Sequence, residues 1–468
     1  MLIVEIPYRD PFAVLHAFAD APYCAFLDSA AEGDARARWS YLGADPFQVI
    51  TSAADGVRVD GKIVPGNPFD VLAQALAKNA IAANAVPDEP SPVPFRGGAM
   101  GYLGYELGRH LERLPAPRPA NPAVPELVLG LYDTVLAFDR LERRAYIVST
   151  GRPEHGAAAQ DRAKARAAAV RRRLDTAPAH APAPDFSLTG RFVPEQPRAL
   201  VEASIARVIE YIRAGDIFQA NLTQQMRAAR PQGLSDLALY ARLRALSPSP
   251  FAAFLRAGPD LSVLSASPER FLSLDPDGRV ETRPIKGTRR RSPDPMEDAR
   301  LAAALLASEK DRAENLMIVD LLRNDLSRVC QVGSVKVPAL CALETFASVH
   351  HLVSVVEGRL KDGLGPVDLL TACFPGGSIT GAPKIRAMEI IHELEPVPRG
   401  VYCGSVCWIG FDGAMDSSIV IRTITRAGET LLAQAGGGIV ADSDPVDEYE
   451  ESLVKLSPML RAVSGDPS

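Results

Sequence analysis

The chain has 468 residues, of which 47% are hydrophobic and 23% are charged, so it is long enough to bury a substantial core. Its formal net charge of −6 at pH 7 argues against nucleic acid as the main partner. Six cysteines in a chain of this length do not make a disulfide scaffold, and the spacing of Cys403 and Cys407 does not predict a zinc site. The sequence has no signal-peptide pattern and no apolar stretch of about 18 residues, so we expect a cytoplasmic protein without a membrane span.

Residues 1–185 are predicted to form an N-terminal portion that mixes strands and helices. A hairpin is indicated by two short apolar runs that flank Asp60-Gly61. The glycine-rich stretch 93–105 fits no nucleotide-binding fingerprint, and close backbone packing is its interpretation. The predicted elements are strands at 47–51, 57–59 and 62–64 and helices at 70–77 and 154–174.

Residues 176–185, with three prolines, are predicted to be a surface linker that separates this portion from the longer one at 196–460. The longer portion again mixes both element types, so the fold class is expected to be α+β. Its predicted helices are 200–214, 311–325, 384–394 and 447–460, and its predicted strands are 216–225, 261–265, 270–274, 403–411 and 419–425.

Two predicted helices carry acidic side chains that could bind a divalent cation. Glu448, Glu451 and Lys455 are spaced so that they share one helix face, and Glu314 lies on another helix. Carboxylates that face one cavity suit Mg²⁺, which prefers oxygen ligands and keeps several waters. The alternative interpretation is ordinary solvated helix charge.

A second candidate is the glycine run 435–440, which we expect to follow a strand and to bring backbone amides close to an anion. The alternative is a flexible turn. The third candidate is Lys286, the one lysine among the arginines of TRPIKGTRRR at 282–291. Unlike arginine, lysine can lose its proton and become a nucleophile, and both nearby arginines and burial would favour the neutral amine. The alternative is a solvated basic run.

Taken together, these segments resemble the chorismate-utilising enzymes. The similarity covers about residues 196–460 and rests on motifs in a fixed order: SPERF (267–271), TRPIKGT (282–288), AENLMIVDLLRNDLSRV (313–329), HHLVS (350–354), GGSITGAPK (376–384), SIVIRT (418–423), GGGIV (436–440) and DEYEESLVK (447–455). The resemblance implies two stacked β-sheets that form a sandwich, with helices outside and the active site between the sheets.

The resemblance also implies roles for individual residues. A Mg²⁺ ion would bind the ring carboxylate of chorismate, with Glu314 and Glu451 as its ligands and Asp311 and Glu448 as supporting carboxylates. Glu269 would be the general acid for the C4 hydroxyl. Substrate contacts are implied for Tyr402, Arg422, Gly438 and Lys455, ring contacts for Gly287 and Thr288, and a catalytic-pocket role for His351.

Two positions favour the branch that makes 4-amino-4-deoxychorismate for p-aminobenzoate and folate biosynthesis. Gln219 stands where water-using members have a lysine base, so ammonia is the expected nucleophile. Lys286 lies in PIKGT, where anthranilate synthases usually read PIAGT, and the resemblance implies that its amine adds at C2 of chorismate. The alternative is anthranilate synthase component I.

No glutamine amidotransferase domain fits within the chain, so we expect ammonia from a separate amidotransferase subunit. Residues 26–29 and 247–251 resemble the tryptophan pocket of anthranilate synthase, and tryptophan is therefore a candidate ligand. Ordinary packing of these two segments is the alternative.

Overall fold

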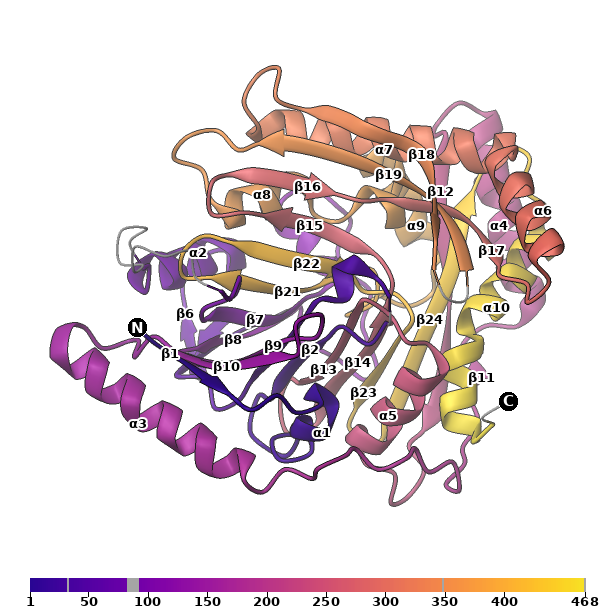
Figure 1. Ribbon diagram of the computed structural model, residues 1–468. Coiled ribbons are helices and arrows are strands. Elements are labelled where there is room, and N and C mark those ends of the chain that lie inside the picture. The colour runs from indigo at the N-terminus through magenta and orange to yellow at the C-terminus, as the bar shows by residue number, and fades with distance from the viewer. Residues whose placement is uncertain (32, 82–91, 347–348, 467–468) are drawn as a thin grey trace.

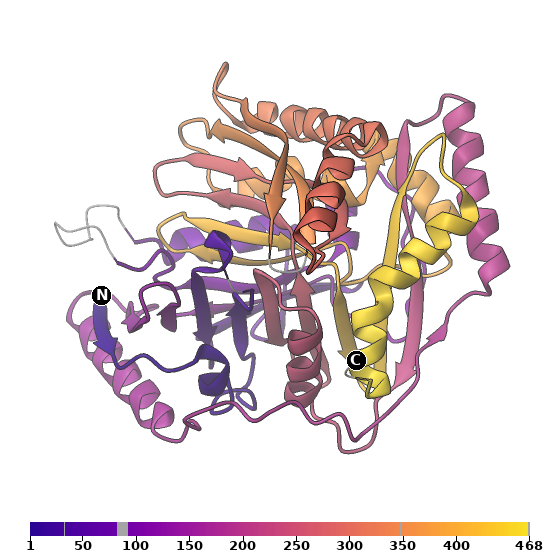
Figure 2. The same ribbon diagram turned by 45° about the vertical axis from the view of Figure 1, so that its right-hand side comes forward.

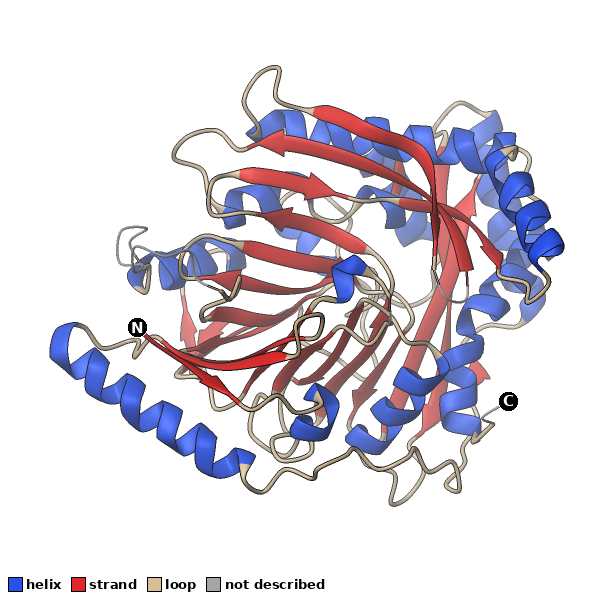
Figure 3. Ribbon diagram, viewed as in Figure 1, coloured by secondary structure: helices blue, strands red, loops and turns tan. Residues whose placement is uncertain are grey.

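The computed structural model describes residues 1–31, 33–81, 92–346 and 349–466 (Figure 1). Within these ranges the strands form two sheets of twelve strands each, and the helices lie on the outside (Figure 3). In the order of hydrogen bonding, the first sheet contains β1 (Leu2–Ile6), β10 (Arg144–Ser149), β9 (Thr134–Asp139), β3 (Trp39–Gly43), β2 (Ala25–Asp28), β13 (Phe251–Arg256), β14 (Leu261–Ser267), β23 (Thr423–Ala427), β24 (Thr430–Ile439), β12 (Gln219–Ala229) and β11 (Val193–Pro194), with β20 (Gly381–Ala382) beside β12.

The second sheet is also antiparallel and is equally mixed in chain order. It contains β17 (Ile285–Arg290), β19 (Val349–Arg359), β16 (Arg279–Thr282), β15 (Arg270–Leu274), β22 (Met415–Ile419), β21 (Ser405–Gly410), β7 (Gly98–Leu103), β8 (Leu127–Tyr132), β4 (Gln48–Ala53), β5 (Gly56–Val59) and β6 (Lys62–Val64), with β18 (Lys336–Thr345) beside β19. The helices are α1 (Pro11–Leu15), α2 (Pro68–Lys78), α3 (Gly156–Leu174), α4 (Arg198–Arg213), α5 (Asp236–Leu246), α6 (Pro295–Leu306), α7 (Glu309–Val329), α8 (Pro366–Cys373), α9 (Lys384–Leu394) and α10 (Pro445–Ser464).

A hydrophobic layer holds the two sheets together. Tyr41 and Val135 of the first sheet belong to the same buried cluster as Tyr102, Val128 and Trp408 of the second. The ring centroids of Tyr41 and Trp408 lie 5.9 Å apart across this layer. Because each sheet buries one face in a common core, the predicted α+β sandwich with helices outside is confirmed.

The N-terminal portion and the longer portion share both sheets. Strand β2 pairs with β13 in the first sheet, and β7 pairs with β21 in the second. Residues 176–185 contain no helix or strand, as the prolines predict, and they run along the surface between α3 and the second portion (Figure 2). The predicted boundary at residue 185 therefore separates two stretches of sequence, but both stretches contribute strands to each sheet and share one hydrophobic core.

The two helices that carry the acidic motifs begin at well-formed caps. The Ser308 side chain accepts a hydrogen bond from the backbone N–H of Asp311 at the start of α7. Asp444 accepts from two backbone N–H groups at the start of α10, whose first residue is Pro445. These caps fix where each helix starts and hence the direction in which its carboxylates point.

Two predictions about local structure are wrong. Residues 419–425 are not one strand, because the chain leaves β22 after Ile419 and turns through Arg422, whose φ of 53° lies in the left-handed region, before β23 begins. The glycine run does not follow a strand but lies inside β24. Glycine is needed there because β12 packs too closely for a side chain: a Cβ on Gly436 would lie 1.9 Å from the carbonyl oxygen of Leu222.

None of the helices in the described ranges combines the length and the apolar character that crossing a bilayer requires.

Candidate active site

The predicted site residues come from both sheets and from two outer helices. Figure 1 shows β17, β24 and α10 next to one another at the right-hand side of the molecule. Lys286 lies on β17, Gly438 on β24, and Glu451 on α10. Helix α7 adds Glu314, which packs within electrostatic reach of Lys286. The fold therefore gathers motifs that are far apart in the sequence.

Lys286 is aimed by an irregularity in its own strand. The register between β17 and β19 shifts between Lys286 and Thr288, which leaves Gly287 as an extra residue with a φ of 78°. A Cβ on Gly287 would lie 2.9 Å from the Asp311 side chain, so only glycine lets α7 approach here. The half-buried Lys286 side chain places its Nζ 3.5 Å from the carbonyl oxygen of Ser378.

The charges around Lys286 differ from those expected. Arg283, Arg289 and Arg291 each pair with a carboxylate, those of Glu344, Asp311 and Asp298 respectively. The positive charge of Lys286 instead favours the ionised form of three carboxyl groups, on Glu269, Glu314 and Glu451. Lys286 therefore interacts electrostatically with these three carboxyl groups, whereas the three flanking arginines are neutralised by other carboxylates.

Glu269 has the properties of a proton donor. Its side chain is buried at the corner between β14 and β15, and burial raises its pKa from 4.5 to about 6, against the opposing effects of a hydrogen bond with Ser378 and the charge of Lys286. A carboxyl group with this pKa carries a proton in about one molecule in ten at pH 7, far more often than a carboxyl group with the ordinary pKa of 4.5. The corner itself is held by the Ser267 hydroxyl, which donates to the carbonyl of Ile419.

Glu314 on α7 and Glu451 on α10 lie close to the same two lysines, because Lys286 and Lys310 act on both carboxyl groups. Burial raises the pKa of Glu314, and the neighbouring carboxylates of Asp311 and Glu448 act in the same direction. Burial also opposes ionisation of Glu451, but Lys455, which lies 2.7 Å away, together with Lys310 and Lys286 outweighs burial and lowers the pKa of Glu451. The same lysines therefore link the acidic side chains of the two helices.

The supporting carboxylates are held differently. Glu448 accepts a hydrogen bond of 2.6 Å from Ser443 and lies 3.5 Å from Lys310, whereas Asp311 pairs with Arg289 at 3.2 Å. No three acidic, histidine or cysteine side chains of the described residues converge into a ready-made metal centre. Mg²⁺ commonly takes only one or two protein carboxylates and completes its shell with water and substrate. The all-oxygen donors of Glu314 and Glu451 fit that ion.

Cationic and polar groups surround the acidic pair. Arg422 is deeply set, its pKa is lowered by burial, and its guanidinium makes no hydrogen bond or ion pair within the described part of the chain. Lys455 donates to the carbonyl of Gly436 at 2.9 Å in addition to its contact with Glu451. Tyr402 is buried, and its phenol influences the ionisation of Arg422. An unpaired guanidinium in such a setting is suited to a substrate carboxylate.

Gln219 and Gly438 meet where β12 and β24 pair. A Cβ on Gly438 would lie 1.8 Å from Nε2 of Gln219, so the absence of a side chain leaves room for this amide. Gln219 is buried, and its Oε1 has no hydrogen-bond partner among the described residues. A buried amide oxygen without a partner is costly, and a bound polar molecule could satisfy it.

His351 closes the other side of the site on β19. Its Nδ1 lies 2.8 Å from the Thr288 hydroxyl, and its imidazole also hydrogen-bonds the backbone of Gly287. Burial, followed by the charges of Arg36 and Arg422, lowers the pKa of His351 to about 4. The imidazole is therefore neutral at physiological pH and bonds to the two residues that follow Lys286.

Comparisons with known proteins agree on one family. The family described as chorismate binding enzyme matches residues 23–461. Aminodeoxychorismate synthase component 1 of Salmonella typhimurium is 41% identical over 468 residues, which cover 98% of this chain and 97% of the relative. Anthranilate synthase component 1 of Streptomyces coelicolor is also 41% identical, over 93% of this chain and 83% of the relative. The crystal structure of anthranilate synthase component I from Streptococcus pneumoniae superposes with a TM-score of 0.79 at 32% identity, covering 91% of this chain and 92% of that one.

The chain belongs to the chorismate-binding enzyme family. The resemblance inferred from the motifs is thereby confirmed, and the family match extends through most of the N-terminal portion, beyond the range 196–460 that the motifs indicated. The individual roles assigned to the site residues stay predictions.

Two residues of this chorismate-binding enzyme were not singled out from the sequence. Ser378 contacts both Lys286, through its carbonyl, and Glu269, through its side chain. Lys310 lies near Glu448, Glu314 and Glu451. The motif GGSITGAPK contained the signal for Ser378, and Lys310 precedes Glu314 by one helical turn, but neither pattern reveals which side chains turn inward.

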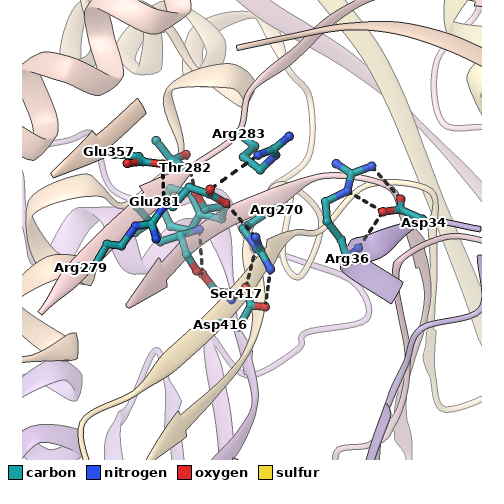
Figure 4. A network of polar contacts seen from close by, with 12 residues as sticks. Asp34, Arg36, Arg270, Arg279, Glu281, Thr282, Arg283, Glu357, Asp416 and Ser417 are labelled. Carbon is teal, nitrogen blue, oxygen red and sulfur yellow. Dashed lines mark hydrogen bonds and ion pairs between the residues drawn. The ribbon is translucent and has the colours of Figure 1, made fainter. Parts of the chain in front are cut away.

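A separate cavity of about 720 Å³ lies between the N-terminal strands of this chorismate-binding enzyme and the second sheet. Its lining includes Asp28, Ser29 and Phe251, so the two segments expected to form a tryptophan-type pocket do lie together. Arg270 forms part of the wall and pairs with Asp416 and Glu281 at 3.0 and 2.9 Å (Figure 4). The cavity wall thus combines the aromatic ring of Phe251 with positively and negatively charged side chains, while the ligand of the cavity stays a prediction.

Proposed function

We propose that this protein converts chorismate and ammonia to 4-amino-4-deoxychorismate, the precursor of p-aminobenzoate in folate biosynthesis. The observation that carries the proposal is the position of Lys286, whose amine is surrounded by Glu269, Glu314 and Glu451 and does not extend into bulk solvent. A relative with 41% identity over nearly the whole chain is named aminodeoxychorismate synthase component 1, which supports the same activity.

The charges of the site account for binding of a dianionic substrate. Glu314 and Glu451, supported by Asp311 and Glu448, would hold Mg²⁺, which would neutralise the ring carboxylate and polarise the ring. Arg422 and Lys455 would bind the second carboxylate, and the backbone near Gly438 and the Tyr402 phenol would complete the contacts. Thr288 and Gly287 would lie along the ring.

The pair Lys286 and Glu269 can supply the two protonation states that the reaction needs. Attack requires a neutral amine, and departure of the C4 hydroxyl requires a protonated acid. One proton shared by the pair is sufficient, because its transfer from the Lys286 ammonium to the Glu269 carboxylate creates both states at once. Burial of Glu269, which raises its pKa to about 6, makes this transfer less costly.

In the first covalent step, the Lys286 nitrogen forms a bond to C2, the two ring double bonds shift from C1=C2 and C5=C6 to C1=C6 and C4=C5, and the C4–O bond breaks. Glu269 gives its proton to the departing hydroxide, which leaves as water. Ammonia then forms a bond to C4, both double bonds return to C5=C6 and C1=C2, and the C2–N bond to Lys286 breaks. The surplus proton of the new ammonium passes to the Glu269 carboxylate, and both side chains return to their starting forms.

Gln219 favours ammonia over water as the second nucleophile. An amide side chain cannot remove a proton from water, but its unpaired, buried Oε1 could accept a hydrogen bond from ammonia. We further propose that a separate glutamine amidotransferase subunit supplies the ammonia. The word component in the relative's name is consistent with a second subunit.

The deciding experiment is incubation of the purified protein with chorismate, Mg²⁺ and an ammonium salt, followed by mass analysis of the product. We expect an amino product that retains the enolpyruvyl group. The alternative is anthranilate synthase activity, because a relative of that name is equally identical. Anthranilate and pyruvate as the main products would refute our proposal and establish the alternative.

Variants of the lysine test its role as nucleophile. Lys286→Ala removes the amine, and we expect aminodeoxychorismate formation to fall by roughly 100-fold or more, with anthranilate as a candidate side product. Lys286→Arg is the matched control, because it keeps the positive charge but cannot form the adduct. An unchanged rate and product in both variants would show that no lysine adduct is required.

We propose L-tryptophan as the ligand of the cavity lined by Asp28, Ser29 and Phe251. The cavity volume of about 720 Å³ accommodates an indole ring, and the carboxylate of Asp28 could bind an α-amino group. Calorimetric titration should detect binding of L-tryptophan that is lost in Ser29→Trp, a variant designed to fill the cavity. Heat of binding that is the same in this variant would place the ligand elsewhere.

A further inference from the structure

One arginine of the N-terminal portion reaches the catalytic side of the molecule. Arg36 lies on a short 3₁₀ turn, η1 (Ala35–Ala37), and its guanidinium pairs with Asp34 at 2.8 and 3.0 Å. Its remaining nitrogen, Nη1, is buried without a hydrogen-bond partner in the described chain. Figure 4 shows the Asp34–Arg36 pair set apart from the Arg270 network, and Arg36 also lines the large cavity.

The guanidinium of Arg36 is stacked on an aromatic ring. Its Cζ lies 4.9 Å from the ring centroid of Phe346, at the end of β18, which is a cation–π distance. The Phe346 ring in turn lies 5.6 Å from the imidazole of His351, at an angle of 55°. Arg36, Phe346 and His351 therefore form one stack that connects the N-terminal portion to β19.

The far end of this stack holds the strand that carries Lys286. His351 hydrogen-bonds the Thr288 hydroxyl and the backbone of Gly287, the extra residue of the bulge that follows Lys286. A bulge re-aims the side chains next to it. A shift of the imidazole would therefore be transmitted to the direction of the Lys286 side chain.

The same arrangement controls the charge on the imidazole. The cations that face His351 are Arg36 and Arg422, and the carboxylates near it are Asp34, which is paired with Arg36, and Glu344, which lies opposite His351 in the β18–β19 register and is paired with Arg283. Two cations close to a buried ring disfavour its protonated form. A neutral imidazole keeps an acceptor for the Thr288 hydroxyl.

We infer that Arg36 is a positioning residue for Lys286, acting through Phe346 and His351. No part of the family motifs that indicated the function includes Arg36, and the inference extends the proposed function to a residue outside the 196–460 portion. It rests on the proposed function only in so far as Lys286 is the reacting group. The geometry of the stack stands independently of the reaction.

The test combines a titration with kinetics. The protein is labelled with [¹³Cε1]histidine, the His351 signal is identified by its loss in His351→Gln, and its pH dependence is followed by NMR. In Arg36→Gln we expect the pKa of His351 to rise from about 4 by roughly half a unit to one unit, since one of the two cations is removed while burial remains. We also expect kcat to fall about tenfold with little change in KM for chorismate, because a misplaced nucleophile reduces turnover more than binding.

Two further variants separate charge from stacking. Arg36→Lys keeps the charge but loses the planar guanidinium, so the pKa of His351 should stay low while kcat falls. Arg58→Gln is the matched control: Arg58 lies on β5 of the N-terminal portion, pairs with Asp55 at 2.6 Å and does not line the cavity, and both readouts should match the unmodified protein. Should Arg36→Gln not fold, Phe346→Leu cuts the stack at its middle, and the same loss of kcat is expected.

An unchanged His351 titration together with an unchanged kcat in folded Arg36→Gln would overturn the inference. Failure of the proposed function would look different, because the protein would then form no 4-amino-4-deoxychorismate in any variant. The NMR titration would still report whether Arg36 acts on His351.

Discussion

The buried carboxyl group of Glu269 is expected to couple the stability of the protein to its activity. Burial raises the pKa of Glu269 from 4.5 to about 6 in the folded protein. As the pH rises, Glu269 therefore ionises in the unfolded chain before it ionises in the folded protein. Its contribution to the free energy of unfolding is fully present below pH 4.5 and is lost as the pH rises through about 6. The difference of 1.5 pH units between these values corresponds to about 2 kcal/mol.

Glu269→Gln removes the ionisation but keeps the size of the side chain and an acceptor for Ser378. We therefore expect the variant to gain about 2 kcal/mol in free energy of unfolding, relative to the unmodified protein, as the pH rises from 4 to 7.5. At the same time its turnover should fall by about 100-fold or more, because the amide cannot donate the proton.

Urea unfolding of both proteins at several pH values, followed by fluorescence, measures the difference. Glu210→Gln serves as the control: Glu210 is an exposed residue of α4 that pairs with Arg207, and its replacement should change stability by less than about 1 kcal/mol at every pH. A stability difference for Glu269→Gln that does not depend on pH would refute the assignment of a raised pKa to Glu269.

Three other perturbations address the surroundings of the site. Arg399→Met should lower the free energy of unfolding, measured with urea, by about 3–5 kcal/mol. The substitution leaves the buried carboxylate of Glu395 without its ion pair of 2.7 Å. A loss below about 1 kcal/mol would show that Arg399 is not needed to neutralise Glu395. Gly438→Ala should impair activity because the added Cβ would overlap Nε2 of Gln219. The double variant Gly438→Ala/Gln219→Ala should regain chorismate binding in an equilibrium assay. Equal binding by the single and double variants would exclude the overlap as the cause. Removal of divalent cations with EDTA should abolish turnover and added Mg²⁺ should restore it, with Glu314→Gln requiring at least about tenfold more Mg²⁺; full activity in EDTA would rule out the proposed metal.

Several features of this protein were determined by its sequence alone. The spacing of Glu448, Glu451 and Lys455 fixed one face of α10, because a helix repeats its direction every 3.6 residues. The choice of lysine at 286 identified a nucleophile candidate, because among the residues of the basic run only lysine can become a free amine. The ordered motifs identified the family, and with it the sandwich fold.

Other features were decided only by the tertiary structure. The arginines around Lys286 were expected to act on its amine, but three of them, Arg283, Arg289 and Arg291, are paired with carboxylates that lie outside the basic run. The raised pKa of Glu269 depends on its burial at a strand corner, and the role inferred for Arg36 depends on an aromatic ring more than 300 positions further along the chain. Local periodicity encodes the direction of a side chain within its own element. Desolvation, ion pairing and ring stacking depend on which elements meet in space, and this is settled only when the two sheets pack.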